Sequence, residues 1–511
     1  MKIPGLDTDF QRLAAPLPIH FARVAPATWS ALASAVAASQ GQIVSLWASD
    51  HGADGRTVSA AYQTSEGLVI AELALTAAGS YPDIASQFPA ASRMQRAAHD
   101  LVGVKAAGAT DQRPWLRHAA WPAHYLPLAA GNSGAESFAQ GEDDYPFVRV
   151  EGDGVHEIPV GPVHAGIIEP GHFRFSVVGE KVLRLEERLG YTHKGVERRF
   201  AGLELAAGAR LAGRVSGDST VAYAWAYAMA AESLVGARIP DRASWLRALL
   251  LERERIANHL GDLGALGNDA SFGFALTQFS LLREDWQRTS QAVFGHRLLM
   301  DQIVPGGVAH DLDEQAIAAQ LEQIRSVREM VAKLRRIFDE HAGMQDRFVT
   351  TGHVDQELAL RLGLTGFALR ASGIARDLRS DFPFAPYAQV DFKCMTRTNG
   401  DVGARVNQRF DEISESLRLI LRLLRALPSG PIAAPLGADG RGRGFGWVEG
   451  WRGPVMVALE TGSDGRIARC HCHDPSWQNW PVLEHAIIGN IVADFPLINK
   501  SFNLSYSGQD L

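Results

Sequence analysis

The sequence predicts an α+β protein in which a small mixed α+β domain precedes a large helical-bundle domain with small β-sheets. In the first part of the chain, residues 29–38 show an alanine-rich helical pattern and residues 67–75 an apolar strand pattern. Further along, apolar side chains recur at three- and four-residue spacings, as from Ile317 to Leu334, which is typical of a long packed helix. The mixed patterns therefore give way to a mainly helical domain.

A polar stretch separates these two parts. Residues 129–145 read AAGNSGAESFAQGEDDY, where glycine, serine and acidic residues interrupt any apolar periodicity. At roughly 150 residues per domain, a chain of 511 residues has room for two or three domains. We therefore expect domains at residues 1–128 and 147–511, joined by a linker at residues 129–146.

The second domain is expected to begin with short strands and to continue with helices. The patterns predict, in order, a strand at 148–150, a hairpin at 173–185 turning near Gly179, a buried helix at 221–237, a helix capped by Asp241, a helix containing His296, a helix from Asp313, a helix at 404–426 that stops before Pro428, a strand-rich stretch at 447–469 and a final helix near Leu483.

Composition excludes several classes of protein. The formal net charge is -7 and no basic block is present, which argues against a nucleic-acid-binding protein. Three cysteines cannot form a disulfide framework, and this favours a reducing compartment such as the cytoplasm. The N-terminal residues do not resemble a secretory signal, and the most apolar run, 221–237, is shorter than the roughly 20 residues of a membrane span. Any membrane association is expected to be peripheral, through partner subunits.

The sequence predicts no metal site. Residues 470–473 read CHCH, but alternate side chains of an extended segment face opposite ways, so at most two of the four can meet at one ion. Cys394 stands alone, which excludes an iron–sulfur cluster with four cysteine ligands from this chain. No phosphate-binding loop is present, and the glycine-rich residues 440–446 are expected to form a turn.

The densest cluster of chemistry-bearing residues lies in two neighbouring segments. GPVHAGIIEPGHFRF, residues 161–175, and GYTHKGVERRF, residues 190–200, place histidines and carboxylates within about one hairpin of each other. A carboxylate beside histidines suits a proton relay. Solvated loop polarity explains the pattern equally well. The candidate residues are His164, Glu169, His172, His193 and Glu197.

These segments also carry a resemblance. With PGGV at 305–308 and LRASGIARDLR at 369–379, they resemble the large subunit of group 4 membrane-bound [NiFe] hydrogenases and the homologous 49-kDa subunit of complex I. Residues 81–104 and 113–128 resemble the 30-kDa subunit of complex I, fused in front. The resemblance implies a 30-kDa-like first domain and a hydrogenase-large-subunit-like second domain. Glu169 matches the glutamate implied to transfer protons in these hydrogenases, and His172, His193 and Glu197 would act with it.

The departures from the family pattern bear on function. Hydrogenases of this group carry two cysteine pairs because thiolates are the soft ligands that hold nickel and iron. The matching positions here are Ser216, Ser219, Ser476 and Asn479. We therefore expect no NiFe cluster and no hydrogenase activity, as in cysteine-free relatives found in energy-converting-hydrogenase-related complexes. Arg214 and Asp218, which flank the first pair, are expected to line the remaining cavity.

Complex I suggests a quinone in that cavity. There a tyrosine and a hairpin histidine hydrogen-bond the quinone headgroup. By ungapped placement, Gly217 stands here at the tyrosine position and Pro170 near the histidine, with His164 and His172 as nearby substitutes. Quinone binding is thus an open expectation, and this chain is expected to bind no other cofactor.

Two functions remain open at this point. The first is an electron-transferring subunit of a membrane-bound, complex-I-like oxidoreductase on the cytoplasmic face of the inner membrane, beside an iron–sulfur small subunit and antiporter-like subunits. NADH would need a separate flavin-bearing partner, since this chain has no nucleotide fingerprint. The second is a structural or coupling subunit, without redox chemistry, of a complex that handles ions or inorganic carbon.

Overall fold

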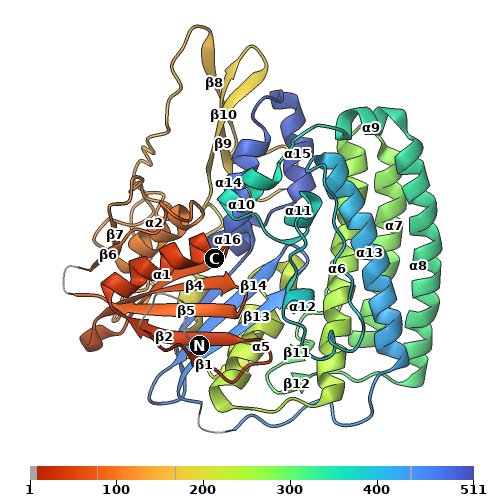
Figure 1. Ribbon diagram of the computed structural model, residues 1–511, viewed down its shortest axis with the longest axis horizontal. Coiled ribbons are helices and arrows are strands. Elements are labelled where there is room, and N and C mark those ends of the chain that lie inside the picture. The colour runs from red at the N-terminus through yellow and green to blue at the C-terminus, as the bar shows by residue number, and fades with distance from the viewer. Residues whose placement is uncertain (1–7, 77–78, 167, 438–439) are drawn as a thin grey trace.

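A computed structural model describes residues 8–76, 79–166, 168–437 and 440–511. The first domain is built on a five-stranded sheet of order β1-β2-β5-β4-β3, in which β2 and β5 are parallel and the other pairs antiparallel. The expected first helix and apolar strand are present as α1 and β5 (Figure 1). The elements of this domain are β1 Gln11–Arg12, β2 Ile19–Val24, α1 Pro26–Ala38, β3 Gln42–Asp50, η1 Gly52–Asp54, β4 Arg56–Thr64, β5 Gly67–Ala74, β6 Ser80–Pro82, α2 Ala91–Val102 and β7 Lys105–Ala107.

A long loop connects the first domain to a three-stranded sheet of order β10-β9-β8. No helix or strand occurs between residues 108 and 154, all of which are described. The predicted strand at 148–150 is wrong, because the Val148 N–H donates to Glu186 Oε2 (2.8 Å) instead of to a neighbouring strand. The outer strand is β8, Val155–Val160, which pairs with β9, His172–Val178. The expected hairpin is confirmed, because β9 turns at Gly179 into β10, Lys181–Arg188.

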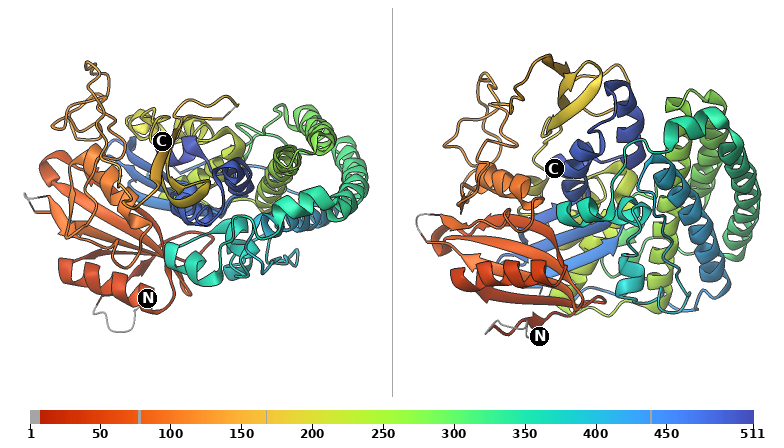
Figure 2. Two further views of the ribbon diagram at one scale, coloured as in Figure 1. Left: turned by 90° about the horizontal axis from the view of Figure 1, so that it is seen from above. Right: turned by 45° about the horizontal axis from the view of Figure 1, so that its top comes forward.

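Helices form the bulk of the second domain, and Figure 2 shows them on the side away from the first sheet. The buried helix expected at 221–237 is present as α5, and the helix from Asp313 is capped by that side chain, which accepts a hydrogen bond from Ala316 N. The long helices are α5 Thr220–Val235, α6 Asp241–Asp269, α7 Gly273–Phe294, α8 Glu314–Glu340 and α13 Val402–Arg425. The shorter elements are α3 Val196–Phe200, α4 Leu205–Ala212, η2 Gly217–Ser219, β11 Ile303–Val304, β12 Gly307–Val308, α9 Ala342–Phe348, α10 Gln356–Leu362, α11 Gly366–Ala371 and α12 Leu378–Asp381.

The C-terminal part adds an antiparallel sheet and three helices. The sheet runs in chain order through β13 Gly442–Glu449, β14 Pro454–Thr461 and β15 Ile467–His473. It is followed by α14 Ser476–Ala486, η3 Val492–Asp494, α15 Phe495–Phe502 and α16 Tyr506–Asp510. The helix near Leu483 is therefore present but is not the final one.

Glycines in β13 let a helix and a strand approach closely. A Cβ on Gly444 would lie 2.0 Å from Ala230 O, and one on Gly446 would lie 1.8 Å from Ala226 O, both in α5. The expectation of a turn at 440–446 is wrong for this reason, since the alternating glycines form a strand that packs directly on the backbone of α5. This contact holds the apolar helix α5 against the sheet.

Two further expectations about helix ends are wrong. Asp241 is the first residue of α6 and its side chain caps nothing, because Pro240 occupies the cap position. His296 lies just beyond α7, which ends at Phe294 and Gly295, and its Nδ1 accepts hydrogen bonds from Leu298 N and Met300 N. Within the described ranges, no helix combines the length and apolar character needed to cross a bilayer.

Replacing Gly446 by alanine should destabilise the protein. The added Cβ cannot fit beside Ala226 O, so helix and strand must separate, at a cost of about 1–3 kcal/mol by analogy with overpacked cores. Gly273→Ala is the matched control, because a Cβ at that first position of α7 meets nothing within 4 Å. Midpoints of urea unfolding test this; equal midpoints for the two variants would contradict the close contact.

Candidate functional site

An ion pair joins the loop before α5 to the turn between β13 and β14. Arg452 Nη1 lies 2.9 Å from Asp218 Oδ1, and Nη2 lies 2.5 Å from Oδ2, so the contact is bidentate. The Arg452 side chain is 4% exposed, whereas that of Asp218 is 32% exposed. Burial disfavours the charged carboxylate, but the charge and hydrogen bonds of Arg452 outweigh it and lower the pKa of Asp218 to about 2. Asp218 is therefore ionised at neutral pH.

Serine hydroxyls surround this pair. Ser216 Oγ donates to Asp218 Oδ1 (2.7 Å), and Ser219 Oγ lies 3.3 Å from the same oxygen. Ser505, at the start of α16, brings its Oγ to 3.0 Å from Ser216 Oγ, and its N–H donates to Ser476 Oγ (2.9 Å). Because Ser216 gives its proton to Asp218, Ser505 must be the donor toward Ser216. Three of the four positions that match hydrogenase cysteines thus meet around Ser505 and Asp218.

The fourth position, Asn479, turns its amide elsewhere. Its Oδ1 accepts from Thr365 N at 3.0 Å, so it ties α14 to the start of α11. Hydroxyl and amide groups engaged in this way supply none of the thiolates that a nickel–iron centre needs. The donor set therefore does not fit that centre. Over the described parts of the chain, no group of three or more His, Cys, Asp or Glu side chains is placed to hold a metal ion.

Glu169, in the loop between β8 and β9, contacts Ser507 of α16, close to Ser505. Its carboxylate accepts from Ser507 N (3.2 Å) and forms a short hydrogen bond with Ser507 Oγ. Glu169 is exposed, whereas Ser505 and Ser216 are buried. A line of polar groups therefore leads from solvent at Glu169, through Ser507 and Ser505 of one turn, to Ser216 and Asp218.

The hairpin histidines are held by backbone carbonyls. His164 Nε2 donates to Gly171 O (2.8 Å), and His172 Nδ1 donates to Gly161 O (3.2 Å). Arg174 Nε in turn donates to His172 Nε2 at 3.3 Å, so both ring nitrogens of neutral His172 are engaged. These histidines shape the loop next to Glu169, and neither hydrogen-bonds to it.

His193 and Glu197 point to two different places. His193 Nδ1 donates to the backbone carbonyl of Asp510 (2.8 Å), the last residue of α16. Glu197 instead binds Arg469 Nη2 (3.1 Å) and His471 Nδ1 (2.6 Å), while His471 Nε2 lies 2.8 Å from Ser45 Oγ of the first domain. Burial opposes ionisation of Glu197, but Arg469 and His471 lower its pKa to about 2. The structure therefore does not bring Glu197 together with Glu169, and the single cluster expected from the sequence is divided.

Arg214 does not line the site. Its guanidinium pairs with Asp301 at the surface (2.6 and 2.7 Å), where both side chains are more than a third exposed. The expectation that Arg214 lines the cavity is therefore wrong, and the arginine beside Asp218 is Arg452, which lies 234 residues away in sequence. The CHCH segment behaves as expected: His471 faces β3 and Trp47, while buried Cys470 and Cys472 lie on the opposite face of β15.

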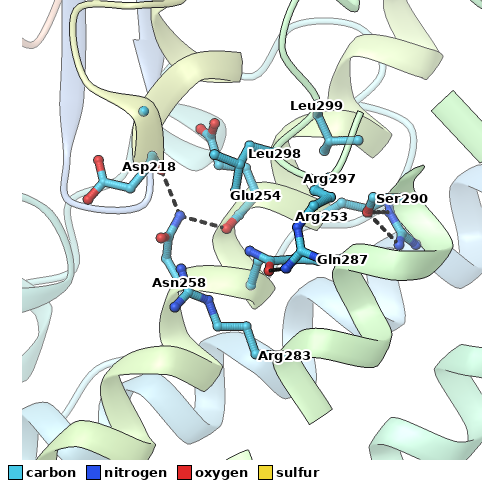
Figure 3. A pocket seen from close by; sticks show the side chains of 12 residues that line it. Asp218, Arg253, Glu254, Asn258, Arg283, Gln287, Ser290, Arg297, Leu298 and Leu299 are labelled. Atoms are coloured by element: carbon cyan, nitrogen blue, oxygen red, sulfur yellow. Dashed lines mark hydrogen bonds between the residues drawn. The ribbon is translucent and has the colours of Figure 1, made fainter. Parts of the chain in front are cut away.

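Sequence reasoning missed Glu254. Its carboxylate accepts from Val221 N (2.6 Å) and Ala222 N (3.2 Å) at the start of α5, directly behind the Asp218 loop (Figure 3). Burial raises the pKa of Glu254 to about 8, although the two N–H groups oppose this. A signal was available, because Glu254, Asn258 and Gly261 repeat at four- and three-residue spacings along one face of α6.

Sequence comparisons agree with this architecture. Residues 22–133 match the family described as the 30-kDa subunit of respiratory-chain NADH dehydrogenase, and residues 270–438 match the 49-kDa subunit of the same enzyme. The chain therefore belongs to the family that unites the 49-kDa subunit of complex I with the large subunits of group 4 membrane-bound hydrogenases, in the form with a fused 30-kDa-like domain.

Individual relatives include subunits of hydrogenases. Formate hydrogenlyase subunit 5 of Escherichia coli is 30% identical over 84% of this chain and 77% of its own length. Carbon monoxide-induced hydrogenase of Rhodospirillum rubrum is 31% identical over 68% of this chain and 97% of its own length. Among solved structures, a chain of the membrane-bound sulfane sulfur reductase, an archaeal respiratory membrane complex, superposes with a TM-score of 0.66, at 26% identity, over 70% of this chain and 98% of that chain.

Removing Arg452 should cost far more stability than removing Arg214. Arg452→Met leaves the Asp218 carboxylate without its partner in a largely buried site, a loss of at least about 2 kcal/mol. Arg214→Met breaks an equally bidentate but exposed pair, which is worth less than about 1 kcal/mol. Chemical unfolding of both variants checks this, and similar losses would show that the Asp218 pair has no special role.

Glu254 should make stability depend on pH. Between about pH 5 and 8 the Glu254 carboxyl is deprotonated in the unfolded chain but still protonated in the folded chain. The free energy of unfolding therefore falls as pH rises. Glu254→Gln should flatten this slope relative to wild type, whereas Glu340→Gln, at the exposed end of α8, should not. Unfolding midpoints at pH 6 and pH 8 give the comparison; parallel slopes in wild type and Glu254→Gln would refute the assignment.

Proposed function

We propose that this chain is a peripheral electron-transfer subunit of a membrane-bound, complex-I-like oxidoreductase that carries out no nickel–iron chemistry. The observation that supports this is the line of polar side chains from exposed Glu169 to Asp218, hydrogen-bonded at every step except between Ser507 and Ser505, which ends at the positions that match the family's metal ligands. A proton path that ends at positions without thiolate ligands suits reduction of an acceptor that takes up protons. A partner's iron–sulfur cluster would supply the electrons.

The acceptor in this proposal is a quinone. Its reduction needs two electrons, from the partner cluster, and two protons, which the Glu169 line would deliver. Ser507 and Ser505 belong to one turn, so one water molecule or a rotation of one hydroxyl completes the path between them. Ionised Asp218, held by Arg452, accepts a hydrogen bond from the Ser216 hydroxyl and would be the last group of the line before the acceptor.

An apolar surface is available for partner subunits. Exposed hydrophobic side chains occur on the loop between β8 and β9, on β9 and β10, and on the loop after α14, where Ile491 forms a β-bridge with Lys181 of β10. They are Val163, Ile168, Val178, Leu183, Ile488 and Ile491. Such a patch is typical of a permanent subunit interface. We assign it to the iron–sulfur small subunit or to antiporter-like membrane subunits, on the cytoplasmic face of the membrane.

Affinity purification of the tagged chain from solubilised membranes tests the assignment of partners. Recovery of an iron–sulfur small subunit together with antiporter-like subunits supports the redox function. Recovery of membrane subunits without any cluster-bearing partner favours the second candidate, a non-redox coupling subunit. One observation favours this second candidate: the serine groups around Ser216 already hydrogen-bond to one another and to Asp218.

Glu169→Gln should abolish turnover while the complex still assembles. The amide cannot carry a proton, so quinone reduction by the purified complex should fall about 100-fold or more. Glu157→Gln is the control, because it removes a carboxylate from the same sheet but outside the line, where it pairs with Arg174. Adding His172→Ala to Glu169→Gln should lower the rate no further. Unchanged turnover in Glu169→Gln, with normal assembly, would refute the proposed path.

A further inference from the structure

A pocket between α6 and α7, lined mostly by charged and amide residues, has no role in the proposed function. Its cavity is about 90 Å³, which is room for a few waters or for an anion of three or four heavy atoms, and residues 297–299 also line it (Figure 3). The facing side chains repeat at the same spacing on both helices. From α6 come Glu254 and Asn258, and from α7 come Arg283, Gln287 and Ser290.

Arg283 is the unusual member of this pocket. Within the described residues its guanidinium makes no hydrogen bond or ion pair, and its Nε is buried without a partner. It lies against Gly261, where a Cβ would come within 3.2 Å of Arg283 Nη1, so the glycine provides room for the side chain. Buried donors in folded proteins are nearly always satisfied, so an unpartnered guanidinium Nε points to a bound acceptor.

The charges around the pocket leave it positive. Arg253 is fully buried and has only neutral partners: Ser290, Gln320, Gln323 and a backbone carbonyl. The Asp218 carboxylate points away from the pocket to Arg452, and the exposed Arg297 is neutralised by Glu284 (2.6 Å). Two guanidiniums therefore face one glutamate, Glu254. Burying such charge without a counter-ion is costly.

We propose that this pocket binds a small carboxylate-type anion, such as formate or bicarbonate, held by Arg283 and Gln287. The planar guanidinium fork of Arg283 matches the two oxygens of a carboxylate. The Gln287 Oε1 already accepts from Arg297 Nη2 (3.1 Å), while its NH₂ group makes no hydrogen bond within the described chain and can donate to the anion. Asn258 joins the pocket to the Asp218 loop by donating to Asp218 O (2.7 Å).

Calorimetric titration of the purified full-length chain with sodium formate tests this. Formate should replace chloride at constant ionic strength, and formamide serves as the neutral analogue. We expect saturable binding of formate and none of formamide. Arg283→Met should weaken binding about tenfold or more, since a hydrogen bond to a charged group is worth about 1.5–3 kcal/mol. Arg325→Met, an exposed arginine of α8, should bind as wild type does.

Arg283→Lys covers the case in which the methionine variant does not fold. It keeps the charge but loses the fork, so formate binding should again weaken. Formate affinity that is unchanged in either Arg283 variant would overturn the proposal. So would the absence of saturable formate binding to wild type, or equal binding of formamide. The assay measures binding alone, so its outcome is independent of the Glu169 path and of turnover.

Discussion

The bidentate pair between Asp218 and Arg452 is the constraint on which the site depends. It joins the loop before α5 to the turn between β13 and β14, two segments that are far apart in sequence. Trp451 strengthens the same junction, because its Nε1 donates to Asp218 O (2.9 Å). With the loop held in this way, Ser216 and Ser219 keep their hydroxyls on the Asp218 carboxylate. The polar pair thus fixes the geometry of a region where the family's metal ligands are absent.

The family motif at residues 369–379 is part of a buried ion-pair network. Within residues 369–379, Arg370 contacts Glu412 (2.8 Å) and Glu449 (3.1 Å), and Arg379 contacts Glu252 (2.9 Å). These charges connect α6, α11, α12, α13 and β13 in the interior. Removing one member would leave an unpaired buried charge, which is more damaging than the loss of an apolar contact. The motif is therefore explained by how the bundle is assembled, apart from any chemistry at Asp218.

The two domains meet through a polar contact as well as apolar ones. Ser45 of β3 lies 2.8 Å from His471 of β15, and His471 binds Glu197 (2.6 Å). Trp47 stacks on the same imidazole, with ring centroids 5.0 Å apart. Because His471 is fixed on both sides, Glu197 serves to dock the first domain. This accounts for a charged residue that, in sequence, stands with the candidates for proton transfer.

The sequence by itself determined the order of domains, the long helices and the hairpin, because each rests on a local pattern: apolar spacing, a capping aspartate, a turn at Gly179. It also determined that thiolates are missing at the four ligand positions, since this needs only residue identity. The expectation failed where a pattern was ambiguous. Glycines at 440–446 suggest a turn, but Gly444 and Gly446 lie in a strand, and their lack of side chains lets α5 pack against it.

Only the tertiary structure decided which charged groups act together. Arg214 is next to the site in sequence yet pairs with Asp301 at the surface, while Arg452 and Ser505 come from distant segments. For the same reason Glu169, His193 and Glu197 contact Ser507, Asp510 and the domain interface, respectively. Hydrogen bonds form only over distances of a few ångströms. These distances are set by how helices and sheets pack, and residue spacing in the sequence does not reveal them.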